Sequence, residues 1–150
     1  MEGSRAVYRG EGEGESHMNG EEVDSKKLRL YLGQYYDEIR NEVETHADTT
    51  VCIAGGAAFA MYHDIPILSD IDVFILGQDY ETVYRGDSIV DYVYSKYKTV
   101  DELLQSFPLS CEQIAIELHL WGTEMKGRFV LTDEFLRTME TGLVMVDVTA

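Results

Sequence analysis

The sequence predicts an α/β (α+β) domain, a small mixed β-sheet flanked by helices. Short apolar segments rich in β-branched residues alternate with stretches whose apolar residues recur every three or four positions. Glycine, proline and polar residues separate the two kinds of segment. The length of 150 residues suits one ordinary domain, and a hydrophobic fraction of 45% is typical of globular proteins.

In the first half of the domain, the order of elements is helix, strand, helix, strand. The helices are predicted from amphipathic or small-residue spacing, and the strands from apolar runs that end at glycines. The predicted elements are a helix over 25–43, a strand over 49–54, a helix over 57–62 and a strand over 70–76.

The second half continues the alternation. Thr99 and Thr132 are suitable N-caps, and Pro108 ends the helix before it. The predicted elements are a short helix over 79–84, a strand over 89–94, a helix over 99–106, strands over 113–120 and 128–131, and a helix over 133–140, with 143–148 either a strand or an extended tail.

Residues 1–24 are predicted to be a flexible acidic tail rich in glycine and glutamate. The stretch from Gly10 to Glu15 alternates these two residues and has no apolar side chain to bury. The Ser16-His17-Met18 sequence also resembles a vector-derived junction, with Met18 as the native start. We therefore expect a solvated leader followed by a single domain over 25–150.

The chain is strongly acidic, with 28 Asp and Glu against 12 Lys and Arg and a formal net charge of −16. Such a surface repels phosphate backbones, which disfavours extended nucleic acid as a partner. We expect no membrane partner, because the apolar runs are too short to span a bilayer. The absence of a secretory pattern, and the placing of Cys52 and Cys111 in apolar runs, favour free thiols in the cytoplasm. The oligomeric state stays open.

Gly55-Gly56 joins a predicted strand to a predicted helix. Two glycines allow a tight turn and let a ligand approach the backbone closely. The free amides at the start of the helix suit an anion such as a phosphate. A simple tight turn explains the same residues equally well.

Asp70-Ile71-Asp72 opens the next predicted strand. Residues two apart on a strand project to the same face, so the two carboxylates lie together while Ile71 faces the core. Close carboxylates repel each other unless a cation lies between them, and Mg²⁺ prefers such oxygen ligands. A pair of solvent-facing acids is the alternative, which the apolar residues that follow make weaker.

Asp91 lies in the middle of an apolar strand, Ile89 to Tyr94. A buried carboxylate there needs a partner, and a strand beside Asp70 and Asp72 would complete a cluster of three acids. An acid on an exposed edge strand is the competing interpretation. Glu112 and then Glu117 are the next candidates for the third carboxylate.

Together, Gly55-Gly56, Asp70-Ile71-Asp72 and Asp91 resemble the nucleotidyltransferase superfamily of the polymerase-β type. The similarity covers about residues 50–95, and residues 99–115 resemble small stand-alone bacterial, phage and large-virus members. This resemblance implies a nucleotide-binding transferase that moves a nucleoside monophosphate from an NTP, such as ATP, to a hydroxyl and releases pyrophosphate.

The resemblance also assigns residues. Asp70, Asp72 and Asp91 would be catalytic and would bind Mg²⁺ or Mn²⁺, while Gly55, Gly56 and Ala57 would bind the nucleotide phosphates. The acceptor would be a small molecule, a nucleotide or a protein hydroxyl, and the base of the NTP stays open.

Two departures from the family pattern support a second hypothesis. Ala57 replaces a serine found in many members, and Pro108 stands where an acid usually follows the phenylalanine. A catalytically degenerate module, such as a toxin–antitoxin component or an accessory protein, fits these losses. A plain acidic α/β protein is a third, weaker alternative. His63, in the loop before Asp70, is placed to reach a phosphate, and a solvated loop histidine is the alternative.

Overall fold

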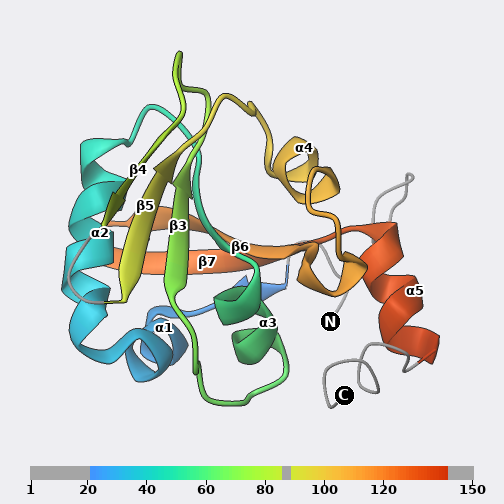
Figure 1. The fold of residues 1–150 in the computed structure, drawn as a ribbon. Coiled ribbons are helices and arrows are strands. Elements are labelled where there is room, and N and C mark those ends of the chain that lie inside the picture. Colours follow the sequence, from blue (N-terminus) through green and yellow to red (C-terminus); the bar gives the residue numbers. More distant parts are fainter. Residues whose placement is uncertain (1–20, 86–88, 142–150) are drawn as a thin grey trace.

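The computed structural model describes residues 21–85 and 89–141, which form one seven-stranded sheet with helices on both faces (Figure 1). The strand order is β1-β7-β6-β2-β3-β5-β4, and β3 and β5 are parallel while the other neighbours are antiparallel. The predicted mixed α+β sheet is therefore confirmed. The strands are β1 (Glu22–Val23), β2 (Val51–Ala54), β3 (Ile71–Ile75), β4 (Thr82–Arg85), β5 (Val90–Tyr94), β6 (Ile114–Trp121) and β7 (Glu124–Leu131).

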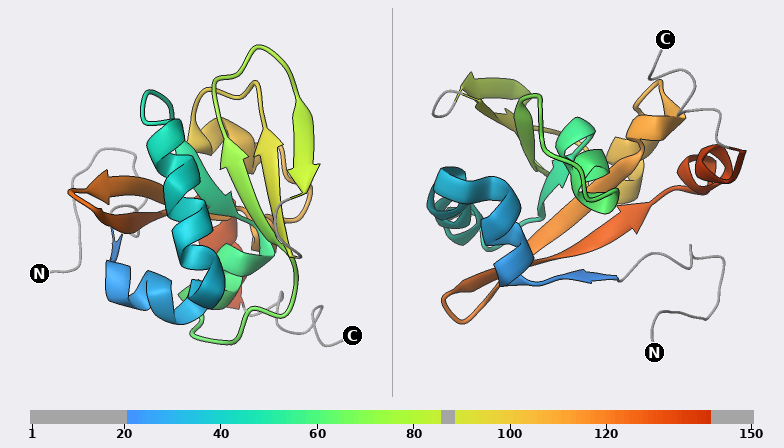
Figure 2. Two further views of the ribbon diagram at one scale, coloured as in Figure 1. Left: turned by 90° about the vertical axis from the view of Figure 1, so that its left-hand side faces the viewer. Right: turned by 90° about the horizontal axis from the view of Figure 1, so that it is seen from below.

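Most of the helices pack on one face of this sheet, where α1 and α2 lie together (Figure 2). The opposite face is covered in part by α4. Among the described residues, no helix is long and apolar enough to cross a membrane. The helices are α1 (Ser25–Leu32), η1 (Gly33–Tyr35), α2 (Tyr36–Thr45), α3 (Gly56–Tyr62), α4 (Val100–Gln105), η2 (Ser110–Glu112) and α5 (Asp133–Thr141).

Strand β3 separates two hydrophobic clusters, as its sequence predicts. Ile71, Val73 and Ile75 are fully buried in the larger cluster with residues of α1, α2 and α3. Phe74 belongs to the smaller cluster on the other face, where it packs with Leu104 of α4. At the start of β3 the burial is less complete, since Asp70 is exposed and Asp72 is partly buried.

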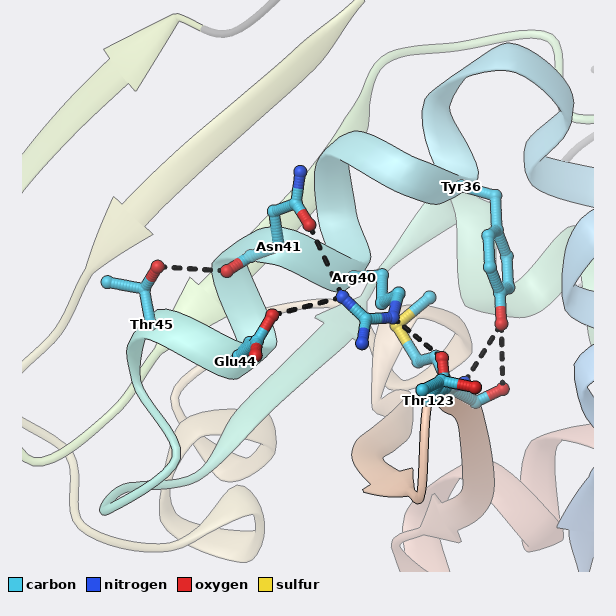
Figure 3. Close-up of polar contacts among 7 residues, drawn as sticks. Tyr36, Arg40, Asn41, Glu44, Thr45 and Thr123 are labelled. Atoms are coloured by element: carbon cyan, nitrogen blue, oxygen red, sulfur yellow. Dashed lines mark hydrogen bonds and ion pairs between the residues drawn. The ribbon is translucent and has the colours of Figure 1, made fainter.

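Hydrogen bonds connect helix α2 to the β6–β7 hairpin (Figure 3). The buried hydroxyl of Tyr36 accepts a hydrogen bond from the Met125 amide at 2.9 Å, and the Nε of Arg40 donates to the Thr123 carbonyl at 2.7 Å. The Arg29 guanidinium lies over the Tyr36 ring, 4.1 Å from its centroid. These contacts hold α2 on the face opposite the acids.

The helix predicted over 25–43 is interrupted. Helix α1 ends at Leu32, and Gly33 has a φ of 54°, a left-handed conformation that glycine adopts without a steric penalty. The chain then forms η1 and restarts as α2. The apolar spacing continues through the break, so periodicity alone does not reveal it.

The short helix predicted over 79–84 is wrong, because Thr82–Arg85 form strand β4. Hydrogen bonding to β5 in an antiparallel hairpin overrides the local preference of that acidic segment. The folded part also begins before Ser25, since β1 pairs with β7 and the Val23 side chain is buried. The tail over 1–20 and the segment 143–148 lie outside the described residues.

Candidate active site

The three predicted acids lie close together on the α4 side of the sheet. Asp72 and Asp91 are opposite each other in the register of the parallel strands β3 and β5, and Asp70 immediately precedes β3. In the same register row, Ala54 lies beside Asp72 and Ala115 beside Ala54. The acids therefore continue a row of small side chains, which are themselves buried in the smaller cluster. We call Asp70, Asp72 and Asp91 the acid row.

The acid row is a site of electrostatic repulsion. Burial raises the pKa of Asp72, and the neighbouring charges of Asp91, Asp70 and Glu112 raise it further. The positive charge of Arg85 acts in the opposite direction and lowers the pKa of Asp72. A carboxylate held among like charges is a group that gains from a bound cation.

The structure adds one residue that the sequence patterns do not reveal, Arg85. Its Nε lies 2.8 Å from Oδ1 of Asp91, and its Nη1 lies 3.4 Å from Oδ2 of Asp70. Arg85 comes from β4, directly opposite Asp91 in the register. Because the sequence patterns predict a helix over 79–84, they predict neither strand β4 nor the pairing of Arg85 with Asp91.

A divalent cation fits the chemistry of the acid row. Oδ1 of Asp91 is buried and accepts no hydrogen bond from the described residues, although Arg85 Nε is 2.8 Å away, so this ion pair is a charge contact without hydrogen-bond alignment. Carboxylate oxygens of this kind are the hard donors that Mg²⁺ prefers. In the conformation described for 21–85 and 89–141, with Arg85 between two of the acids, no three such side chains are already arranged around one point.

The two alternative carboxylates differ in position. Glu112, in η2, is close enough to repel the charge of Asp72, so it borders the acid row. Glu117 is one register row away and forms an ion pair with Arg128 at 2.8 Å. The structure thus associates Asp91 and Glu112 with the site and gives Glu117 a separate partner.

The glycine turn has the predicted strand–turn–helix form. Gly55 is the N-cap of α3 with a φ of 81°, which an L side chain rarely adopts. The Phe59 amide makes the first helical hydrogen bond, to the Gly55 carbonyl, so the amides of Gly56 and Ala57 precede it. Ala57 is buried in the core, and only 1% of the residue is exposed.

Ser69 provides a hydroxyl at this turn that sequence reasoning missed. A Cβ added to Gly56 would lie 3.1 Å from Oγ of Ser69, the residue that precedes Asp70. A hydroxyl is therefore present beside the glycine turn although residue 57 is alanine. The one sequence feature that points to Ser69 is its position next to Asp70. No spacing rule predicts that Ser69 lies beside Gly56.

The tyrosine Tyr92 and the predicted candidate His63 lie elsewhere. Tyr92 faces the opposite side of the sheet and donates to Glu38 at 2.6 Å. His63 packs against the rings of Phe59 and Tyr62, and burial lowers the pKa of its imidazole. Neither belongs to the acid row.

No family model and no curated protein matches the sequence of this chain. Its fold matches CCA-adding enzymes, including one of Thermotoga maritima in complex with tRNA (TM-score 0.54, 15% identity, 79% of this chain and 34% of that chain).

Two further matches are also CCA-adding enzymes. One is an apo form (TM-score 0.55, 15% identity, 81% of this chain and 35% of that chain), and the other is a complex with CTP (TM-score 0.54, 16% identity, 81% of this chain and 34% of that chain). The chain thus spans about a third of the length of these enzymes. At this identity the likeness concerns the fold alone. The seven-stranded sheet and its flanking helices are a nucleotidyltransferase fold.

Proposed function

We propose that this chain is a metal-dependent nucleotidyltransferase that moves a nucleoside monophosphate from an NTP to a hydroxyl acceptor and releases pyrophosphate. The observation that carries the proposal is the pairing of Asp72 with Asp91 across β3 and β5, with Asp70 next to them, in a nucleotidyltransferase fold. The small stand-alone type of this superfamily, as a single domain over 25–150, remains the subtype we favour.

Asp70, Asp72 and Asp91 would hold Mg²⁺ or Mn²⁺. When bound, such ions neutralise triphosphate charge and favour in-line displacement at phosphorus. Oδ1 of Asp91 would accept the proton of the acceptor hydroxyl, because this atom is buried and accepts no hydrogen bond from the described residues.

The glycine turn would bind the phosphates. The amides of Gly56 and Ala57 precede the first hydrogen bond of α3 and would donate to phosphate oxygens. Gly56 leaves no side chain between them and the ligand. The Ser69 hydroxyl beside Gly56 would donate as well, in place of the serine side chain that residue 57 lacks.

The acceptor would be a small molecule, a nucleotide or a protein hydroxyl. The net charge of −16 opposes binding of an extended nucleic acid. The tRNA complex among the structural neighbours belongs to an enzyme of which this chain covers 34%. The buried Cys52 is a thiol outside any disulfide, which supports a reducing compartment and hence the cytoplasm.

The direct test is incubation of the protein with each labelled NTP, Mg²⁺ and a cell extract. We expect one nucleotide to become attached to an acceptor, with loss of this activity in Asp72→Asn. Glu117→Gln is the matched control, because it also removes one strand carboxylate on the same face but from an ion pair outside the acid row. Equal transfer by wild type and Asp72→Asn would refute the proposal.

A degenerate binding or regulatory module is the second candidate. It is favoured by Arg85, whose positive charge already offsets the charges of Asp70 and Asp91, and by the missing hydroxyl at Ala57. Calorimetry with each NTP and Mg²⁺ separates the two functions. Binding of no NTP would favour the module.

A further inference from the structure

Arg85 lies between two carboxylates of the acid row. Its Nε is 2.8 Å from Oδ1 of Asp91, and its Nη1 is 3.4 Å from Oδ2 of Asp70. The planar guanidinium presents several donors in a rigid fork, so one side chain contacts both carboxylates. Arg85 thus supplies positive charge where the three acids converge.

The place of Arg85 is set by the backbone. It is the last residue of β4, and it lies opposite Asp91 in the antiparallel register with β5. Neighbouring side chains on one face of paired strands are in direct contact. The Arg85 side chain is 57% exposed and Asp91 only 15% exposed, so the cation reaches a more buried anion from the solvent side.

A divalent cation needs the same carboxylate oxygens. Two cations that share Asp70 and Asp91 would repel each other at close range, and the guanidinium contacts would have to break before an ion bound both acids. A guanidinium released in this way would be at the rim of the site. Triphosphate oxygens would be its strongest partners there, because arginine binds phosphate through charge-assisted hydrogen bonds.

We infer that Arg85 is the resting counter-cation of the acid row, that Arg85 and a divalent cation exclude each other between Asp70 and Asp91, and that the displaced guanidinium binds the triphosphate of the incoming NTP. This deepens the proposed function and rests on it. Its consequence is coupling: the free site binds metal weakly, and metal and triphosphate bind together more strongly than either alone.

The test measures binding of Mn²⁺ alone and of the Mn²⁺–tripolyphosphate complex by calorimetry, without any turnover. Tripolyphosphate carries the phosphates of an NTP without a base. In Arg85→Gln we expect Mn²⁺ alone to bind roughly 3- to 10-fold more tightly, and the complex to bind roughly 3- to 10-fold more weakly. Arg85→Lys keeps the charge but loses the fork, so its affinities should lie between those of the wild type and Arg85→Gln.

Arg128→Gln is the matched control. Arg128 also forms a 2.8 Å ion pair with a carboxylate on a neighbouring strand, that of Glu117, and its side chain is 49% exposed. The substitution changes net charge by the same amount, but β7 is separated from β5 by β6, β2 and β3. Both affinities of Arg128→Gln should equal those of the wild type. Circular dichroism of each variant checks that it is folded.

The inference is overturned if Arg85→Gln binds Mn²⁺ as the wild type does, if neither binds it, or if Arg128→Gln changes equally. Tighter Mn²⁺ binding with unchanged binding of the complex overturns the phosphate contact. If Mn²⁺ affinities are equal while the wild type still transfers nucleotide through Asp72, the inference fails and the proposed function stands. If the affinities shift as expected but no NTP is consumed, the inference stands and the transferase function fails.

Discussion

Asp72 and Asp91 are direct neighbours across the parallel strands β3 and β5. This is the sheet's one parallel pair among the described strands, so both carboxylates lie at the same, N-terminal end of their strands. The β-sheet therefore holds two like charges together near Asp70. Such an arrangement costs stability in the free protein, and the cost is relieved by a cation.

Asp72→Asn should stabilise the metal-free protein at pH 7. It removes a half-buried charge that Asp91, Asp70 and Glu112 repel. We expect a gain of about 0.5 to 1 kcal/mol in the free energy of unfolding, kept small because solvent screens a half-exposed carboxylate. Urea unfolding of both proteins in the presence of a chelator measures the gain, and a loss of stability would contradict it.

The same gain should depend on pH. The pKa of Asp72 is raised in the folded state, mainly by burial, so the folded protein binds the proton more tightly than the unfolded chain does. The penalty of the charge is absent below the ordinary carboxyl pKa of 3.8, grows as the pH rises through the raised pKa, and is complete above it. Unfolding curves of wild type and Asp72→Asn should therefore converge on acidification and separate toward pH 7. A pH-independent difference would exclude this origin.

Gly55→Ala and Gly56→Ala should fail in different ways. Gly55 has a φ of 81° with open space around it, so alanine there is strained by the backbone alone, at a cost of about 1 to 3 kcal/mol. At Gly56 the new methyl group would lie 3.1 Å from Oγ of Ser69, which must shift. We expect Gly56→Ala to weaken NTP binding more than it lowers the thermal midpoint. If both variants lower the thermal midpoint equally and leave NTP binding unchanged, the glycine turn does not bind the phosphates.

Ser69→Ala should reduce NTP affinity roughly 10- to 100-fold, because a hydrogen bond to a charged group contributes about 1.5 to 3 kcal/mol. The side chain is exposed, so stability should change little. Calorimetry with the preferred NTP measures the affinity. Ser106→Ala is a suitable comparison, since its hydroxyl caps α4 by donating to Leu103 at 2.6 Å and has no place at the glycine turn.

Tyr36→Phe should destabilise the fold without altering NTP binding. The buried Tyr36 hydroxyl accepts a hydrogen bond from the Met125 amide, and its loss leaves that amide without this partner at a cost of about 1 to 3 kcal/mol. Denaturant unfolding measures the loss. A parallel loss of NTP affinity in the folded variant would show that α2 influences the acid row on the other face.

Local patterns predicted much of the fold. Strand β3 is recognisable because it needs apolar residues on both faces, and its alternation places Asp72 with Phe74 and Ile71 with the core. The sequence patterns did not predict strand β4, because the strand is short and exposed and follows an acidic segment. Its pairing with β5, and not its own composition, makes it a strand. The break at Gly33 was missed because a single left-handed residue does not disturb apolar spacing.

The sequence by itself determined which residues carry the acid row and the glycine turn, because a strand's two-residue period and glycine's backbone freedom are local properties of the chain. The tertiary structure alone decided that Asp91 lies opposite Asp72, that Glu112 and Ser69 border the site, and that Arg85 occupies it. These are register and packing relationships between segments far apart in the chain. They are set by the pairing of β3, β4 and β5, and no local pattern encodes them.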